Sequence, residues 1–136
     1  MTGPRIRFPI VGRDTVKILN FYSSVYQANL VVRRKSCTIR LGDKTDKYRE
    51  GDVVWVTYGN RFRAREFLFS AVIDRVTVKE LSDLTPEDIR AENDEFQSVD
   101  EVLTLLSQIY DRDVGPEEQV SVIYFSEIRG GTSRLG

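Results

Sequence analysis

The residues best suited to chemistry occupy one short stretch, RRKSCTIR, which begins at residue 33 and runs from a basic segment into a predicted strand. Because side chains alternate along a strand, Ser36, Thr38 and Arg40 share one face, and the apolar residues between them share the other. Three cations stand directly before this face, namely Arg33, Arg34 and Lys35. Hydroxyls and cations gathered in this way suit a phosphate, a nucleoside or a nucleic acid. The solvated outer face of an antiparallel strand would show the same pattern, so both interpretations stay open at this level.

The absence of histidine limits the chemistry that the chain can perform. The sequence has no histidine and only one cysteine, and these residues are the main protein ligands of zinc and other transition metals. We therefore expect no metal site and no cofactor. Ser-His-Asp and Cys-His catalysis are excluded for the same reason. An enzyme with this sequence would need a carboxylate, a lysine, a tyrosine or a water held by one of them as its base.

Length and composition indicate one globular domain. The chain has 136 residues and a mass of 15.7 kDa, which suffices for one core. No apolar run approaches the ~20 residues that span a bilayer, and the first ten residues lack the apolar segment of a signal peptide. A single cysteine cannot form an internal disulfide. We expect a cytoplasmic protein with no membrane partner.

Charge is distributed unevenly along the chain, although the net charge is only −1. Residues 1–79 contain 16 Lys and Arg against 7 Asp and Glu, whereas residues 80–136 contain 4 against 14. A second basic stretch places three arginines on one strand face, namely Arg61, Arg63 and Arg65. This stripe would suit an RNA backbone. The alternative is a strand edge that carries cations against edge-to-edge pairing.

The predicted elements follow the order strand, helix, strand, hairpin, two helices and strand. Strands are predicted at residues 16–21, 38–41, 53–58, 63–78 and 120–125. Helix starts are marked by Ser23 or Ser24, by Thr85-Pro86, and by a capping-box sequence from Ser98 to Glu101. The last helix places five apolar residues on one face, namely Val99, Val102, Leu103, Leu106 and Ile109. This order predicts an α+β domain with a mainly antiparallel, barrel-like sheet.

The domain is predicted to occupy residues 17–128. Residues 1–16 form an N-terminal extension whose mixed Gly, Pro and charged composition predicts no element. Residues 129–136 are predicted to be a disordered tail.

Several motifs resemble those of one family. Lys35 to Arg40 (KSCTIR) resembles the GRKT-x-TIR signature of ASCH domains, which belong to the PUA-like superfamily. Further similar segments follow in the family's order, namely Gly51 to Val54, Leu84 to Asp88, Ala91 to Asn93, Ser98 to Tyr110 and Val120 to Phe125. Several short motifs in the right order are more specific than any one of them. The resemblance implies an α+β fold: a small PUA-like mixed β-barrel with flanking helices.

Within this family, the sequence is similar to a bacterial branch, N4-acetylcytidine amidohydrolase. The resemblance implies catalysis without a metal by Lys35, Thr38 and Glu92. It also implies contacts with substrate from a basic and polar set, namely Arg33, Arg34, Ser36 and Arg40. Two of these depart from the signature, because Arg33 replaces its glycine and Ser36 replaces a threonine. An arginine at the pocket mouth would narrow it or recruit a phosphate, which favours a nucleotide or RNA over a free nucleoside.

The predicted function is binding of a cytidine-like nucleoside, nucleotide or RNA base in a cleft. The more specific form of this prediction is hydrolysis of the N4-acetyl amide of N4-acetylcytidine. The first alternative is a non-catalytic RNA-binding module that uses the same cleft and the arginine stripe. The third choice is a metal-independent ribonuclease. Without the resemblance, Lys35 would be read as a solvated cation at a helix end, Thr38 as an ordinary strand threonine and Glu92 as one of a run of exposed acids.

Overall fold

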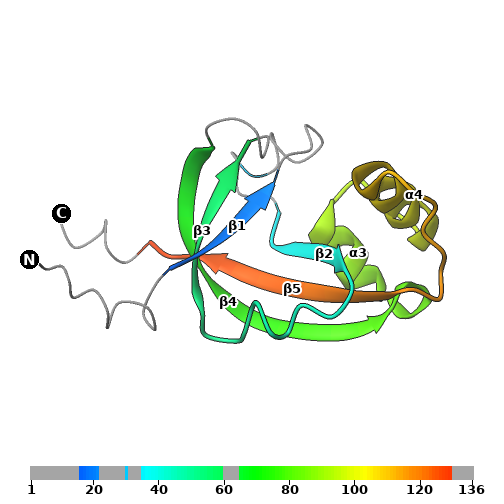
Figure 1. Cartoon of the computed structure of the whole chain (residues 1–136), viewed down its shortest axis with the longest axis horizontal. Coiled ribbons are helices and arrows are strands. Elements are labelled where there is room, and N and C mark those ends of the chain that lie inside the picture. The colour runs from blue at the N-terminus through cyan, green and yellow to red at the C-terminus, as the bar shows by residue number, and fades with distance from the viewer. Residues whose placement is uncertain (1–15, 22–29, 31–34, 60–64, 130–136) are drawn as a thin grey trace, which may run out of the picture.

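The computed structural model describes residues 16–21, 30, 35–59 and 65–129. Five strands form one sheet in the order β1-β3-β4-β5-β2 (Figure 1). The strands are β1 (Lys17–Phe21), β2 (Cys37–Leu41), β3 (Val53–Tyr58), β4 (Glu66–Glu80) and β5 (Gln119–Glu127). A short 3-10 helix η1 (Leu81–Asp83) follows β4, and two helices, α3 (Pro86–Glu92) and α4 (Val99–Tyr110), precede β5. The predicted α+β class is therefore what the chain adopts.

The sheet curls into a half-barrel whose two edges are β1 and β2. The pair β1 and β3 is parallel, and the other neighbours are antiparallel. Side chains bridge the open seam: Arg40 Nη2 on β2 donates to the main-chain oxygen of Asn20 on β1 at 3.1 Å. The Tyr48 hydroxyl, from the loop between β2 and β3, donates to the main-chain oxygen of Ile18 at 2.8 Å. These bonds occupy carbonyls at the free edge of β1, where another strand would otherwise pair.

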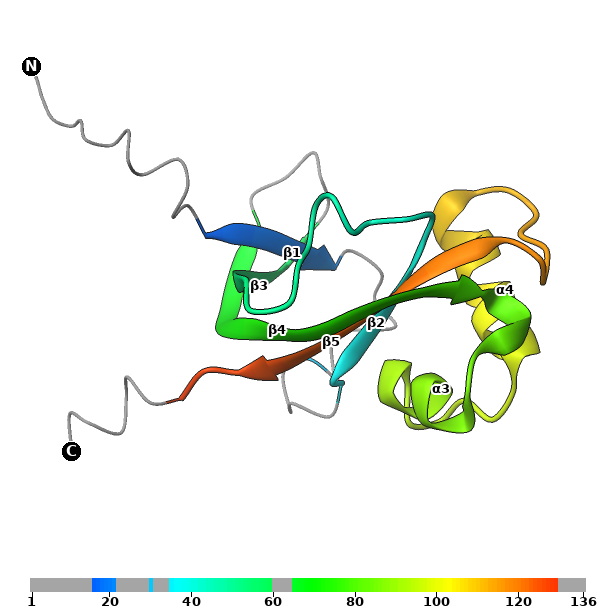
Figure 2. The ribbon, with the colours of Figure 1, turned by 90° about the horizontal axis from the view of Figure 1, so that it is seen from below.

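The long strand β4 holds the two halves of the sheet together. It pairs with β3 through its first half and with β5 from Ala71 to Glu80. Register shifts occur between Val56 and Thr57 on β3, and between Ile73 and Arg75 on β4. Such bulges bend a strand and increase its twist. The bends allow five strands to curve around one interior, as Figures 1 and 2 show.

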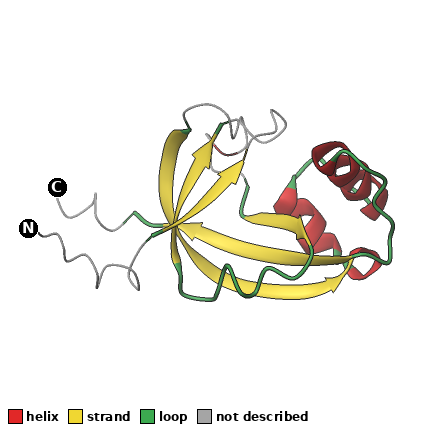
Figure 3. Cartoon of the chain, viewed as in Figure 1, coloured by secondary structure: helices red, strands yellow, loops and turns green. Residues whose placement is uncertain are grey.

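The helices lie together at one end of the sheet (Figure 3). Thr85 caps α3: its hydroxyl accepts from the Asp88 N–H, and the Asp88 carboxylate accepts from the Thr85 N–H. At the start of α4, the Glu101 carboxylate accepts from the main-chain N–H groups of Gln97 and Ser98. Both start signals read from the sequence therefore mark real helix ends. No helix in the described residues is long and apolar enough to span a membrane.

The core has two parts, one on each side of the strands. The first fills the half-barrel and includes Leu19, Phe21, Val56, Phe69, Ile73, Ile123 and Phe125. The second lies under the helices and includes Cys37, Ile39, Leu81, Ile89, Val102, Leu106 and Val122. On the other face of β2, Thr38 is 1% exposed and Arg40 is partly exposed, so Thr38 does not lie on a solvated outer face.

The observed elements differ from the predicted ones mainly at their ends. The β3 strand has the predicted bounds, and β1 and β2 each differ by one residue. On α4, Leu105 is buried and Leu103 is only partly so, so the predicted apolar face was one residue wrong. The long predicted strand from residue 63 begins at Glu66 among the described residues. Most of the first predicted helix, residues 1–15 and residues 130–136 lie outside the described residues.

Candidate functional site

A buried ion pair joins the start of β2 to the end of α3. Lys35 Nζ lies 2.9 Å from Glu92 Oε2 and donates to the main-chain oxygen of Glu92 at 2.7 Å. Both side chains are nearly inaccessible, at 0% and 1% exposed. The main-chain oxygen lies at the end of α3, where the partial negative charge of a helix favours a cation. The helix end and the carboxylate together hold one ammonium inside the domain.

The Glu92 carboxylate is positioned by the strand that it faces. Its Oε1 accepts from the Ile39 main-chain N–H at 2.8 Å, and Ser36 N–H donates to the main-chain oxygen of Ala91 at 3.2 Å. The second oxygen, Oε2, is paired with the Lys35 ammonium at 2.9 Å and has no other donor in the described part of the chain. A carboxylate oxygen can accept more than one hydrogen bond, so Oε2 can also accept one from a ligand or water.

Burial lowers the pKa of Lys35 below its usual value. The attraction of Glu92 and its hydrogen bonding oppose that shift, and the nearby Arg40 guanidinium adds to it. Removal of the ammonium from water is the largest of these effects, so the pKa is lowered overall. A lowered pKa makes the neutral amine, which accepts a proton, easier to reach.

Thr38 and Arg40 form the second half of the constellation. Arg40 Nε donates to Thr38 Oγ1 at 3.0 Å, and the Arg40 guanidinium lies over the Phe21 ring at 4.8 Å from its centroid. The Lys35 ammonium lies over the same ring at 5.5 Å. Both cations therefore meet at one aromatic side chain, with Thr38 bonded to one of them.

A pocket opens beside Lys35, where β5 runs past the start of β2. Its volume is about 220 Å³. The described residues that line it are Lys35, Ser36, Phe69, Phe125, Ser126, Glu127 and Arg129. The Phe125 main-chain N–H donates to the Ser36 main-chain oxygen at 3.0 Å, which fixes β5 against the residue next to Lys35. The pocket combines two aromatic side chains with hydroxyls and charges, a mixture typical of small-molecule sites.

The remaining predicted site residues fall in different places. Ser36 is exposed and lines this pocket. Arg65 is exposed immediately before β4. Arg33, Arg34, Arg61 and Arg63 lie outside the described residues. The structure thus brings Lys35, Glu92, Thr38 and Arg40 into one region and leaves the arginine stripe without a described partner surface.

Sequence reasoning missed the aromatic and acidic parts of this region. Phe21, Phe69 and Phe125 come from three different strands, and nothing local relates them. Glu127 carried one usable signal, because it is the only charged residue of β5.

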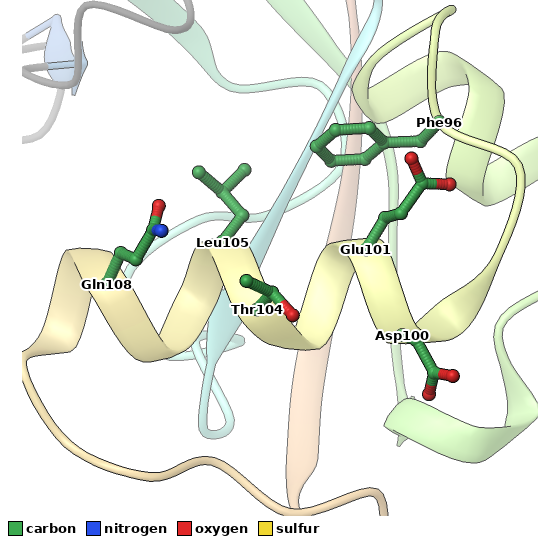
Figure 4. Close-up of a pocket in the computed structure, with 6 residues that line it drawn as sticks. All are labelled: Phe96, Asp100, Glu101, Thr104, Leu105 and Gln108. Carbon is green, nitrogen blue, oxygen red and sulfur yellow. The ribbon is translucent and has the colours of Figure 1, made fainter.

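Two other features of the molecule contrast with this site. A hollow of about 370 Å³ runs along α4 between Phe96 and Leu105 (Figure 4). It is larger than the pocket beside Lys35, but the charged side chains that line it, Asp100 and Glu101, face neither a buried base nor a nucleophile. Within the described ranges, no group of three or more Cys, Asp and Glu residues gathers closely enough to hold a metal ion.

Solved structures with the same architecture exist. The ASCH domain from Lactobacillus crispatus JV V101 superposes with a TM-score of 0.60 at 12% sequence identity, covering 88% of this chain and 84% of that one. This chain has the ASCH-domain fold. Protein EF3133 from Enterococcus faecalis V583, described as DUF984, gives a TM-score of 0.61 at 12% identity over 90% of this chain and 88% of that one. The hypothetical protein PH0355 gives 0.59 at 14% identity over 84% of this chain and 100% of that one.

The ASCH fold confirms the architecture that the motifs implied. Identities of 12–14% show a common fold, and the residues of a site must be argued from the site itself. No family model matches the sequence, and no curated protein matches it.

Proposed function

We propose that this ASCH-fold domain binds N4-acetylcytidine beside Lys35 and hydrolyses its acetyl amide without a metal. The observation that carries the proposal is the buried Lys35–Glu92 pair, which adjoins an aromatic-sided pocket. A buried lysine with a lowered pKa and a charged partner, placed beside a pocket, is a common mark of catalytic sites. The resemblance of the sequence to the amidohydrolase branch supplies the reaction.

The first chemical step forms an ester on Thr38. Lys35, as the neutral amine, takes the proton of the Thr38 hydroxyl, and Oγ1 attacks the acetyl carbonyl carbon. Arg40 Nε, which donates to that oxygen at 3.0 Å, stabilises the negative charge on Oγ1 as its proton leaves. The C–N4 bond then breaks, and the Lys35 ammonium returns the proton to N4. Cytidine leaves, and the acetyl group stays on Thr38.

Water completes the reaction by the same route. Lys35 removes a proton from a water that attacks the acetyl ester, and it returns that proton to Thr38 Oγ1 as the ester C–O bond breaks. Acetic acid leaves and loses its remaining proton to the solvent. Glu92 orients the substrate, because its Oε2 accepts the amide N–H of N4-acetylcytidine. It also holds the Lys35 side chain in place through its main-chain oxygen. Each protein group returns to its starting protonation state after one turnover.

The alternative function is RNA binding without catalysis. Among the described residues, one observation favours it: Arg65 is exposed beside the sheet, in the arginine-rich stretch of the sequence. The same pocket would then receive an unpaired base. This alternative predicts binding that depends steeply on salt, which nucleoside turnover does not.

The test is incubation of the purified chain with N4-acetylcytidine, with release of cytidine followed by chromatography. We expect turnover by the unaltered protein and by Lys44→Met, in which a loop lysine outside the site is lost. Lys35→Met should lower kcat at least about 100-fold, as expected for removal of a general base. Absence of turnover by the folded, unaltered protein would move the assignment to binding.

Because Lys35→Met also disturbs a buried pair, Thr38 supplies a second test. Thr38→Val keeps the shape of the side chain and removes the proposed nucleophile, whereas Thr38→Ser keeps the hydroxyl. We expect activity only in the serine variant. Equal activity of the two folded variants would exclude Thr38 as the nucleophile.

A further inference from the structure

The helices cover only one half of the outer face of the sheet. Because side chains alternate along a strand, Val120, Val122 and Ile128 share the face of β5 that is directed away from the half-barrel. Val120 and Val122 are buried in the cluster under the helices, whereas Ile128, just past the end of β5, is 42% exposed. Figure 1 shows both helices at the end of the sheet away from β1 and β3.

Large apolar side chains are exposed on the half of this outer face that lies away from the helices. On β3, Val53 and Trp55 alternate with the buried Val54 and Val56, so their side chains point outward. Trp55 is 46% exposed. Phe67 on β4 is 54% exposed and packs edge-on against Trp55, with 5.9 Å between the ring centroids. Aromatic side chains left in water on a flat sheet are typical of an interaction surface.

Ser70 on β4 connects these side chains to Ile128. It pairs with Trp55 on one side, and on the other side its main-chain oxygen accepts from the Ile128 N–H at 2.8 Å. We call Val53, Trp55, Phe67 and Ile128 the Trp55 face. They are four of the five large hydrophobic residues that are exposed in the described part of the chain, so the exposed apolar surface is concentrated in one place.

We propose that the Trp55 face pairs with the same face of a second copy of this chain. A two-fold dimer places one patch of surface against itself, which suits an apolar face. Two sheets pack face to face about 10 Å apart, with side chains such as Trp55 and Phe67 between them. This inference does not rest on the proposed function, because it uses neither Lys35 nor the pocket beside it.

The edge of the sheet is less suited to such pairing than its face. On β1, the main-chain oxygens of Ile18 and Asn20 already accept from the Tyr48 hydroxyl and from Arg40 Nη2. A strand added at this edge would have to displace both bonds. Association through the Trp55 face leaves them intact.

The size of the Trp55 face fits the centre of a dimer interface. With about half of each ring exposed, Trp55 and Phe67 leave roughly 200 Å² of aromatic surface in water. That is about a quarter of the ~800 Å² that each partner contributes to a standard interface. Val53 and Ile128 extend this apolar centre, and the remaining area would be the polar rim that such interfaces have.

The charges around the Trp55 face also favour a second copy. Arg65 and Glu66 are exposed directly before Phe67, and Asp74 is exposed further along β4, so both signs of charge are present beside the face. In a two-fold dimer, a cation of one copy can lie near a carboxylate of the other. The net charge of −1 gives little repulsion between copies.

The experiment measures the mass of the full chain by sedimentation from about 100 nM to 100 µM, a range chosen for standard interfaces. We expect the mass to reach twice the 15.7 kDa of one chain. Trp55 is the only tryptophan, so its fluorescence reports on this face alone and should shift to shorter wavelength as the dimer forms. Phe67→Glu should raise the dissociation constant at least about 30-fold, as expected for a central aromatic residue.

The matched control is Gln108→Glu, which adds the same charge at an exposed position on α4 and should leave the dissociation constant unchanged. Ile128→Lys is a second variant of the Trp55 face and should also weaken the dimer. A dimer that folded Phe67→Glu and Ile128→Lys both leave intact would overturn the inference, because another surface would then join the copies.

A protein that stays monomeric at 100 µM would also overturn the inference. In that case the fluorescence of Trp55 identifies what occupies the face. Emission typical of a buried indole in the monomer would mean that the chain covers its own face. Emission that changes only when single-stranded RNA is added would assign the face to a nucleic acid.

Discussion

At Lys35, burial and pairing act on the ammonium in opposite directions. Burial lowers the pKa of Lys35, and the Glu92 carboxylate counters the shift without cancelling it. A pair of this kind is not a large source of stability, since the loss of hydration nearly offsets the attraction of the charges. Its retention inside a small domain is better explained by chemistry, because a lysine with a lowered pKa serves as a base.

The first prediction is a double-mutant cycle on this pair. Lys35→Met leaves the Glu92 carboxylate buried without its cation, and Glu92→Gln leaves the ammonium without its carboxylate. Each single change should lower the free energy of unfolding by about 3 to 5 kcal/mol. The double variant should lose less than the sum, because neither charge remains. Urea unfolding at constant pH measures all four proteins.

Two outcomes would contradict this account of the pair. Additive losses would mean that the two side chains do not interact. Small single losses, comparable with that of the loop control Lys44→Met, would mean that water reaches the pair. A lysine paired with a carboxylate in an interior without water should give large single losses that are not additive.

At the scale of elements, the short helix α3 is attached to the sheet by two acids one turn apart. Glu92 reaches β2 at the end of the helix, and Asp88 reaches β4 and β5 at its start. Asp88 Oδ1 accepts from the Tyr124 hydroxyl at 2.6 Å, and Oδ2 accepts from Lys79 Nζ at 2.9 Å. A seven-residue helix has little stability of its own, so these contacts set where Glu92 lies.

The second prediction concerns Asp88 and acid. Burial alone would raise the pKa of Asp88, but the hydrogen bonds from Tyr124, Lys79 and Thr85 outweigh it, so the pKa is lowered from the usual 3.8. A carboxyl with a depressed folded-state pKa contributes stability above its unfolded pKa and loses it as pH falls through the folded one. Asp88→Asn should therefore cost about 1 to 3 kcal/mol at neutral pH and flatten the loss of stability below about pH 4.

Denaturant unfolding at several pH values between 2 and 7 tests this prediction. Asp83→Asn, which changes an exposed acid in η1, is the control and should keep the acid-dependent loss. If Asp88→Asn loses as much unfolding free energy below pH 4 as the unaltered protein, then a carboxylate other than Asp88 causes the acid-dependent loss of stability.

Elements with strong local signals could be predicted from the sequence. Val53–Tyr58 is a run of β-branched and aromatic residues. It follows Gly51, whose φ of +90° suits a glycine in the turn. The Thr85 and Glu101 caps could be read because they join residues three apart. Leu105 was missed in favour of Leu103 because α4 packs against both core clusters and buries a wider face than one stripe.

The site was predictable only in part, for a physical reason. Motifs point to Lys35, Thr38 and Glu92, but no local pattern brings residues 35 and 92 together. That contact depends on α3 folding back onto β2. The aromatic side chains of Phe21, Phe69 and Phe125 meet because strand order departs from sequence order, which local periodicity does not encode.

At the scale of the whole molecule, acidic and basic residues are concentrated in different parts of the fold. The acid-rich last third supplies α3, α4 and β5, while the basic residues lie mainly in the earlier strands and loops. The helices cover one end of the sheet (Figure 3). A ligand at the pocket beside Lys35 therefore meets both signs of charge, which suits a neutral nucleoside with donors at each end better than a long polyanion.

The last prediction uses salt to decide between a nucleoside and RNA. A neutral nucleoside displaces no counterions, so kcat/KM for N4-acetylcytidine should change less than about twofold between 50 and 200 mM salt. Single-stranded RNA that contacts three arginines would give a slope near −2 in a plot of log affinity against log salt concentration. Its binding would be roughly 20-fold weaker at 200 mM than at 50 mM salt. Titration of a labelled oligonucleotide beside the turnover assay measures both quantities on the same protein.

Turnover that does not change with salt, together with weak RNA binding, assigns the pocket to a nucleoside, because the net charge of −1 offers a polyanion no general attraction. Tight, steeply salt-dependent RNA binding without turnover would instead make the arginine stripe the functional surface.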